Sequence, residues 1–166
     1  MHATSTIGRW TRPLVAAVLS ACVSFGAAAQ TKLDISVPWG PGEFHSQNAA
    51  RFAERVKEQT KGEVVMTTHP GGTLGVKANE SLRSIGEGVV PMGDYALFQN
   101  ASRGAAMAVE TLPFLVGDYD QLKIMHKYFR PVWEAILQKN NQKALYIVPW
   151  PNQFFFVKRA VASVDD

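Results

Sequence analysis

Short apolar or alternating segments, bounded by turn residues, predict five β-strands in this chain. They cover residues 32–37, 64–68, 91–98 and 144–148, and a fifth strand begins at 154–157. The first segment alternates between polar and apolar positions and ends before a Pro- and Gly-rich turn. Between the strands, apolar residues recur every three or four positions, which is the spacing of one helix face. The pattern therefore predicts strands alternating with helices.

The predicted helices have recognisable first and last residues. The first is expected to begin at Ser46, as its N-cap, and to end at Gly62. A second is predicted over residues 76–86. The longest helix is expected to be capped by Asp118 and kinked at Pro131, because proline removes an internal hydrogen bond.

Strands alternating with helices indicate an α/β fold with a mainly parallel sheet flanked by helices. In such sheets ligands bind beyond the carboxyl ends of the strands, where loops aim side chains and backbone amides inward. The candidate site is therefore predicted at the loops over residues 39–45, 71–74, 94–99 and 150–154.

Four aromatic residues adjoin these loops: Trp39, Tyr95, Trp150 and Phe154. They fit either an apolar core or the wall of a ligand pocket, and the sequence leaves both interpretations open. The glycine-rich loop over residues 71–75 lacks the Gly-Lys-Ser/Thr ending of a phosphate-binding loop. It is predicted to be a tight turn whose glycines supply positive φ.

The first 29 residues have the pattern of an export signal. Arg9 and Arg12 precede an uncharged run over residues 14–29, which is short for a membrane span. Residues 27–29 are alanines and supply the small-x-small pattern that a signal peptidase reads. Cleavage is expected after Ala29, so the protein is predicted to be exported.

The leader also contains Leu-Ser-Ala-Cys, ending at Cys22, which has the form of a lipoprotein box. The apolar run continues past Cys22, however, so simple cleavage after Ala29 is favoured over lipid anchoring. Cys22 is the only cysteine in the sequence, and no disulfide is expected.

The charge of the exported part is close to balanced. Two of the 17 Lys and Arg residues belong to the leader, so 15 basic residues face 14 Asp and Glu, a net charge of +1. The basic residues are dispersed, and the longest contiguous pair is Lys158 and Arg159. Nucleic acid is therefore not an expected partner, because its binding requires clustered positive charge.

The residues do not form a recognisable metal or catalytic motif. His45, His69 and His126 fall on separate elements without the spacing of metal ligands on a helix. A secreted hydrolase would depend on the adjacent His45 and Ser46, since no Gly-x-Ser-x-Gly elbow is present. Capping of a helix is the favoured role for that pair. No catalytic residue, metal or cofactor is expected.

Three ordered motifs point to a known family. They are Pro-x-Gly-x-Leu-Gly at 70–75, Glu-x-Leu-Arg with a following Gly at 80–88, and Leu-Pro-Phe-Leu at 112–115 with Asp-Tyr at 118–119. In this order the chain from Leu33 to Asp166 resembles the solute-binding proteins of tripartite ATP-independent periplasmic (TRAP) transporters, the DctP-like family. The third motif is the most specific.

The resemblance implies a periplasmic protein with two α/β lobes that close over a small organic acid and deliver it to an ion-gradient-driven permease. An orphan or sensory binding protein that feeds a receptor is the alternative. The implied domains are a signal peptide at 1–29, a first lobe at 30–148 and a crossing segment into a second lobe at 149–166. Family members bind the ligand carboxylate with an Arg expected just after residue 166, so the chain is expected to be an N-terminal half. The complete protein is expected to be monomeric.

Loop position and the partial motif match together suggest seven ligand-binding residues: Trp39, His45, Thr73, Asp94, Tyr95, Asn152 and Phe154. Trp39 and Phe154 are expected to stack on the ligand body, and Asn152 to donate to a carboxylate oxygen. Leu97 and Phe155 stand where sugar-acid-binding members are expected to carry Arg. Apolar residues there favour a less polar carboxylate, with an aromatic or branched body.

Overall fold

The computed structural model describes residues 29–151 and 156–163. Within these residues, three strands form one parallel sheet: β1 (Thr31–Ser36), β2 (Val64–His69) and β3 (Met92–Gly93), in the order β2-β1-β3. The central strand β1 pairs along its whole length with β2 but only through Ile35 and Ser36 with β3. The α/β class and the parallel sheet are confirmed.

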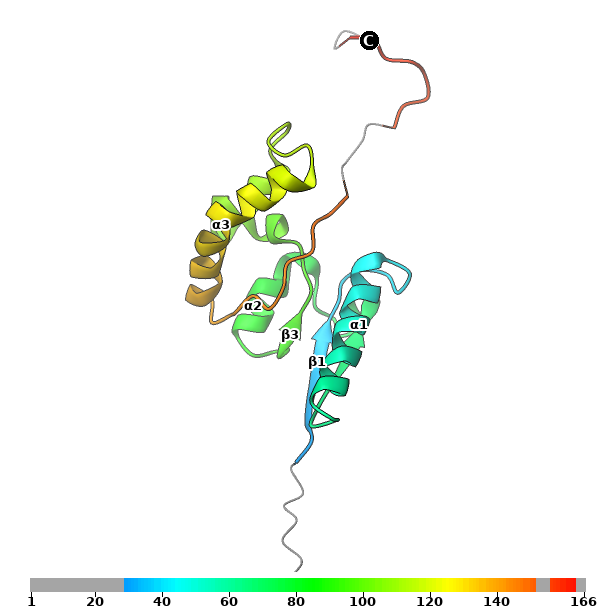
Figure 1. The fold of residues 1–166 in the computed structure, drawn as a ribbon, viewed down its shortest axis with the longest axis vertical. Helices are drawn as coiled ribbons and strands as arrows, with labels where there is room; N and C mark the ends of the chain where they lie inside the picture. The colour runs from blue at the N-terminus through cyan, green and yellow to red at the C-terminus, as the bar shows by residue number, and fades with distance from the viewer. Residues whose placement is uncertain (1–28, 152–155, 164–166) are drawn as a thin grey trace, which may run out of the picture.

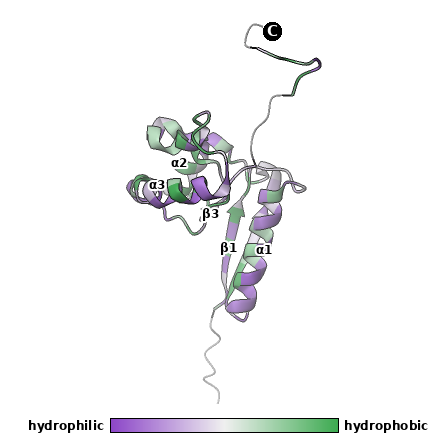
Figure 2. Cartoon of the chain, turned by 45° about the horizontal axis from the view of Figure 1, so that its top comes forward, coloured by the Kyte–Doolittle hydropathy of each residue, from purple (hydrophilic) through white to green (hydrophobic). Residues whose placement is uncertain are grey.

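Helix α1 (Phe44–Gln59) connects β1 to β2 and covers one face of the sheet (Figure 1). Ile35 and Val37 are buried against Ala49 and Ala53 of this helix, and Phe52 packs at the margin of the cluster. Small residues on the helix allow its backbone to approach the sheet closely. The other side of α1 is hydrophilic (Figure 2), so the helix is amphipathic as its spacing predicted.

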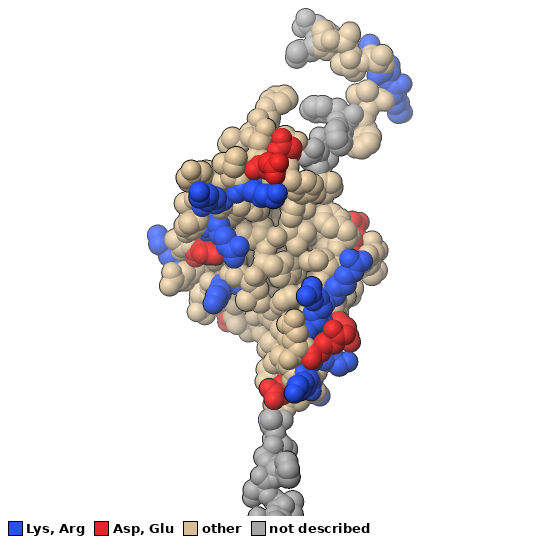
Figure 3. Space-filling model, in the orientation of Figure 1, with Lys and Arg blue, Asp and Glu red and all other residues tan. Residues whose placement is uncertain are grey.

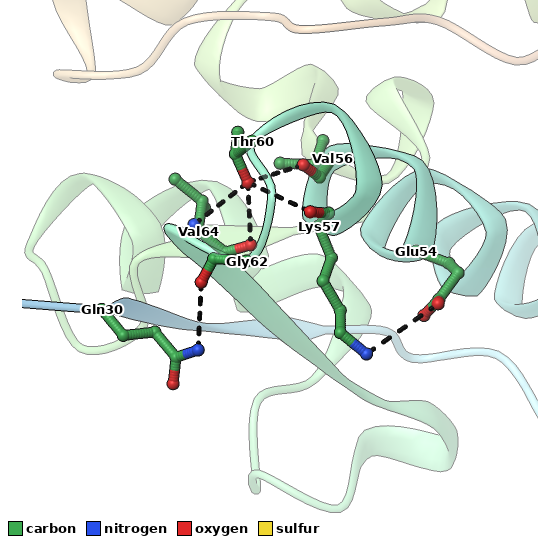
Figure 4. A network of polar contacts seen from close by, with 7 residues as sticks. All are labelled: Gln30, Glu54, Val56, Lys57, Thr60, Gly62 and Val64. Carbon is green, nitrogen blue, oxygen red and sulfur yellow. Dashed lines mark hydrogen bonds and ion pairs between the residues drawn. The ribbon is translucent and has the colours of Figure 1, made fainter. Parts of the chain in front are cut away.

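The turn from α1 into β2 is held by one side chain (Figure 4). Thr60 Oγ1 donates to the Val56 carbonyl at 2.8 Å and accepts from the Val64 amide at 3.1 Å, so it joins helix and strand. Gly62 has a φ of 84°, and its carbonyl accepts from the Gln30 side chain at 3.0 Å. The predicted stop near Gly62 is therefore close to the observed end of the helix at Gln59.

The second half of the described chain packs mainly on itself. It contains α2 (Ser81–Gly86), the 3-10 helices η3 (Leu97–Arg103) and η4 (Ala105–Thr111), and α3 (Tyr119–Lys139). Two apolar clusters join them: Leu82, Met107 and Leu137 in one, and Val109, Met125 and Trp133 in the other. Two further 3-10 turns, η1 (Pro70–Gly72) and η2 (Ala78–Glu80), lead into α2.

The predicted cap of the longest helix is correct. Asp118 Oδ1 accepts hydrogen bonds from the amides of Asp120 and Gln121, at 3.0 and 2.8 Å, and begins α3. Pro131 lies inside this helix, which bends along its length in Figure 1.

Several predicted boundaries were wrong. Helix α1 begins at Phe44 rather than after Ser46, because Ser46 Oγ donates to the Trp39 carbonyl instead of capping the helix. The predicted strand over residues 91–98 is only two residues long, because the chain turns into η3 at Leu97.

Residues 144–148 were predicted as a strand but have no regular structure. Ala144 and Ile147 instead pack against the apolar clusters around α3, and Tyr146 contacts Phe52. These side-chain contacts hold an extended segment without backbone pairing. Of the predicted fifth strand, residues 154–155 lie outside the described residues, and residues 156–157 are not in a strand.

Candidate functional site

The carboxyl ends of β1 and β3 bring two distant side chains together. Ser36 and Gly93 are paired in the sheet, and the Asp94 amide donates to the Ser36 carbonyl at 2.9 Å. Because the strands are parallel, the residues that follow them emerge at the same edge. Trp39 Nε1 donates a hydrogen bond of 3.1 Å to Asp94 Oδ1 across this edge. The predicted loops over 39–45 and 94–99 therefore meet.

The glycine-rich loop fixes the backbone of Trp39. The Gly71 amide donates to the Trp39 carbonyl at 2.6 Å, and the Gly72 amide donates to the Val37 carbonyl at 3.1 Å. Gly71 and Gly72 have φ values of 71° and 69°, in the left-handed region that favours glycine. This loop is the tight turn that the sequence predicted, and it supports the site through the backbone.

His45 lies in the first turn of α1, and its imidazole ring lies beside Asp94. The residue is 4% exposed, and its Nδ1 is 3.9 Å from Asp94 Oδ1. Neither ring nitrogen has a hydrogen-bond partner among the described residues. Its ring lies 4.0 Å from the Phe44 ring, 4.5 Å from Trp150 and 5.8 Å from Trp39, measured between centroids. The imidazole is therefore enclosed by aromatic rings, with one carboxylate beside it.

Burial acts on both ionisable groups of this pair. It lowers the pKa of His45 below 6.5, against the opposing effect of the Asp94 and Glu43 carboxylates. It raises the pKa of Asp94 above 3.8, while hydrogen bonds from Trp39 and Tyr146 and the proximity of His45 oppose this rise. The site therefore favours a neutral imidazole, and donor groups surround the carboxylate.

Two tyrosines lie near the pair in different roles. Burial, with the Asp94 carboxylate as a smaller cause, raises the pKa of Tyr146 to about 12. Tyr95 donates its hydroxyl proton to Gln142 Oε1 at 2.8 Å, and Gln142 Nε2 in turn donates to the Leu82 carbonyl. Burial raises the pKa of Tyr95 as well. Both phenols remain protonated at neutral pH and act as hydrogen-bond donors.

These residues line a cavity of about 590 Å³. Its walls come from β1, from residues 91–98 and from residues 141–150, with Leu33, Ile35 and Leu97 among the apolar members. The volume suits a small organic molecule. Polar groups line it at two places: around His45 and Asp94 at the carboxyl edge of the sheet, and near the end of α3, where Glu134, Gln142 and Lys143 lie.

Of the seven predicted site residues, four line the cavity, one does not, and two lie outside the described residues. Trp39, His45, Asp94 and Tyr95 line the cavity, although the Tyr95 hydroxyl is occupied by Gln142. Thr73 is exposed on the glycine-rich loop and is not part of the lining. Asn152 and Phe154 lie outside the described residues.

Sequence reasoning did not propose Phe44 or Tyr146 for the site. Phe44 covers the His45 ring, and Tyr146 contributes to the surroundings of Asp94. The predicted strand over residues 144–148 was a weak signal for Tyr146, since a strand neighbouring β3 would also end near this edge. Phe44 lies within the predicted site loop over residues 39–45, but it was not named among the ligand-binding residues.

The described residues contain no group of three or more His, Cys, Asp or Glu side chains arranged to hold a metal ion. None of the helices in the same part of the chain has the length and apolar character of a membrane span. On the face in Figure 3, Lys and Arg lie among Asp and Glu rather than in one broad basic surface.

The family model for DctP, the bacterial extracellular solute-binding proteins of family 7, matches residues 35–166. The chain belongs to this family. The match includes the end of β1, the glycine-rich loop and the Leu-Pro-Phe-Leu motif, so the resemblance drawn from the motifs is confirmed. No curated protein sequence matches the chain.

Solved structures agree with this assignment. A TRAP solute-binding protein from an unidentified marine microbe, specific for pyroglutamate, is 33% identical with a TM-score of 0.74, over 80% of this chain and 43% of its own. A Bordetella pertussis extracytoplasmic solute receptor that binds pyroglutamic acid is 26% identical with a TM-score of 0.70, over 73% and 40%. A Ralstonia eutropha TRAP protein with bound (S)-2-acetolactate is 22% identical with a TM-score of 0.59, over 66% and 35%, and shows the fold alone.

This family 7 chain thus spans less than half the length of the solved structures that it matches. The lobe-like α/β architecture predicted from the sequence is confirmed, since the matched parts carry the same fold. Family 7 proteins are solute-binding proteins, and the cavity at the carboxyl edge of the sheet lies where ligands bind in open α/β folds.

Proposed function

We propose that this protein captures a small organic acid outside the cytoplasmic membrane and delivers it to a TRAP-type permease. The observation that carries the proposal is the cavity of about 590 Å³, in which a buried His–Asp pair lies among aromatic rings. Such a site combines an apolar body with a few placed polar groups, as small-molecule sites do.

Pyroglutamate is the first candidate ligand. The relative that is 33% identical is specific for it, and the relative that is 26% identical binds it. A five-membered ring also suits the aromatic surroundings of Trp39 and Trp150, whose ring centroids are 5.1 Å apart. The apolar Leu97 in the lining fits a ligand with few polar groups.

The domain plan is part of the proposal. Residues 1–29 form a cleaved export signal, residues 30–148 the first lobe, and residues 149–166 lead into a second lobe. Closure of the two lobes then adds contacts made only in the ligand-bound state, which shifts the population toward the closed form. Permease subunits recognise this closed form. The coverage of less than half of the matched structures supports this plan.

Calorimetric titration of the full protein, freed of bound solute by unfolding and refolding, tests the ligand class. We expect pyroglutamate to bind with a dissociation constant of about 1 µM or lower, which is about 8 kcal/mol of binding free energy. A refolded protein with a native circular dichroism spectrum that binds neither pyroglutamate nor acetolactate nor erythronate would contradict the proposal. The mass of the protein recovered from the periplasm tests cleavage after Ala29.

A further inference from the structure

His45 is a buried polar side chain that faces the cavity without a hydrogen-bond partner of its own. Its side chain is 5% exposed, and both ring nitrogens lack a hydrogen-bond partner among the described residues. Burying an imidazole in this way is unfavourable unless a partner arrives, because water is removed from two polar atoms. A second His–Asp pair, His69 and Asp34, differs in this respect: it is hydrogen-bonded at 2.7 Å and more exposed.

The Asp94 carboxylate lies beside His45 without a hydrogen bond between them. Both side chains can therefore bind a third group, such as a polar group of a ligand. The separation of 3.9 Å between Nδ1 and Oδ1 exceeds that of a hydrogen bond. Trp39 Nε1, at 3.1 Å, holds the carboxylate in place from the other side. A neutral imidazole has one N–H donor, and a carboxylate only accepts. The pair therefore places one donor next to one acceptor at the wall of the cavity, with both imidazole nitrogens buried.

The rings around the pair restrict the shape of what can bind there. Trp150 meets Trp39 edge to face, with planes at 82°, and meets Phe44 at 80°. Flat aromatic surfaces favour a small, nearly planar ring over an extended, fully hydroxylated chain. The complementary group is then a ring edge that carries an N–H next to a carbonyl oxygen.

We propose that His45 and Asp94 together select a cyclic amide acid, with Asp94 accepting the ring N–H and His45 donating to the ring carbonyl. This inference rests on the proposed function and names two specificity-determining residues within it. A lactam is held cis, so its N–H and C=O lie on the same edge and can meet both groups at once. An analogue with CH2 in place of the ring N–H leaves the carboxylate without its partner, which disfavours binding.

The decisive test compares two ligands on the unaltered full protein. Pyroglutamate and the cyclopentanone carboxylate in which CH2 replaces the ring N–H have the same charge and closely similar shapes, and both carry a ring carbonyl. We expect calorimetry to give an affinity at least about tenfold higher for the lactam, from one hydrogen bond to a charged group. Equal affinities within about twofold would overturn the inference. Failure of the proposed function is different, because then neither acid binds.

Variants of Asp94 and His45 test which of the two residues is responsible for the preference for the lactam. Asp94→Asn replaces the charged acceptor by a neutral amide oxygen and is expected to reduce the discrimination between the two ligands, while Asp34→Asn, in the other His–Asp pair, keeps it. His45→Leu is expected to weaken both ligands about equally, because both retain the carbonyl, and His69→Leu to leave them unchanged. Discrimination that is undiminished by Asp94→Asn in a protein with a native circular dichroism spectrum would overturn the role of Asp94. If that variant does not fold, the ligand comparison on the unaltered protein still decides.

Discussion

Trp39 and Asp94 are 55 positions apart in the chain, yet the indole Nε1 of Trp39 donates a hydrogen bond of 3.1 Å to Asp94 Oδ1. The contact joins the loop after β1 to the residue after β3. It also stabilises the ionised form of a carboxylate whose pKa is raised by burial. Structure and electrostatics of the cavity therefore depend on the same contact.

Trp39→Phe keeps an aromatic ring but removes the indole donor. We expect the pKa of Asp94 to rise further, because its ionised form loses a hydrogen bond. The free energy of unfolding is expected to fall by about 1.5 to 3 kcal/mol, the range for hydrogen bonds to charged groups. NMR titration of the Asp94 carboxyl measures the first effect and urea unfolding the second. Trp150→Phe is the control, and an equal rise of the Asp94 pKa in it would contradict the explanation.

His45 is expected to make stability depend on pH. Burial lowers its pKa from 6.5 in the folded state, against the Asp94 and Glu43 carboxylates, so between the two values the unfolded chain binds more protons. The free energy of unfolding contributed by His45 therefore rises with pH through this window and levels off above 6.5.

His45→Asn is expected to remove this contribution. Urea unfolding at several values between about pH 5 and pH 8 measures it, as the slope of the unfolding free energy against pH. His69→Asn is the matched control, because His69 lies beside Asp34 in the more exposed pair. An unchanged slope in the His45 variant would show that another group titrates.

Replacing a glycine of the glycine-rich loop is expected to strain the backbone. Gly71→Ala places a side chain at a φ of 71°, in the left-handed region, and is expected to destabilise the protein by about 1 to 2 kcal/mol. The Gly71 amide also holds the Trp39 carbonyl, so the near-ultraviolet circular dichroism of Trp39 is expected to change. Gly42→Ala is the control, since no atom lies within 4 Å of the added Cβ and its φ is not in that region. Equal stability of the two variants would exclude a strained turn.

The cap of α3 offers a test at a distance from the cavity. Asp118→Ala removes the acceptor of two backbone amides and is expected to lower the free energy of unfolding by about 0.5 to 2 kcal/mol. Asp120→Ala removes an exposed carboxylate that pairs with Lys123, and its effect is expected to be smaller. Thermal unfolding of both variants measures the difference. A larger loss in the Asp120 variant would show that the cap is not what stabilises this end.

The sequence pattern predicted an element correctly where the interactions that define the element are between neighbours in the chain. The two long strands were predicted within one residue at either end, since alternation in the first, β-branched residues in the second and turn residues around both define them. Asp118 was recognised as a cap because its partners are the next amides in the chain. Ser46 was misassigned as a cap because its partner is the Trp39 carbonyl, in the loop that the glycine-rich turn holds.

Residues 144–148 show why the remaining elements escaped prediction. Their continuous apolar run, Ala-Leu-Tyr-Ile-Val, is typical of a strand, but a strand also needs a neighbouring edge to pair with. β3 is two residues long, and the segment is held by side chains, such as Tyr146 against Phe52. Propensity alone does not report whether such an edge exists.

The sequence by itself determined the α/β class, the family and two of the segments at the cavity, residues 39–45 and 94–99, because these follow from periodicity, turn chemistry and ordered motifs. Only the tertiary structure decided that His45 and Asp94 form a pair, with Phe44 and Trp150 around it. Their separation of 3.9 Å and their burial result from the parallel register of β1 and β3 and the close approach of α1. Packing between distant segments, which no local pattern encodes, sets both.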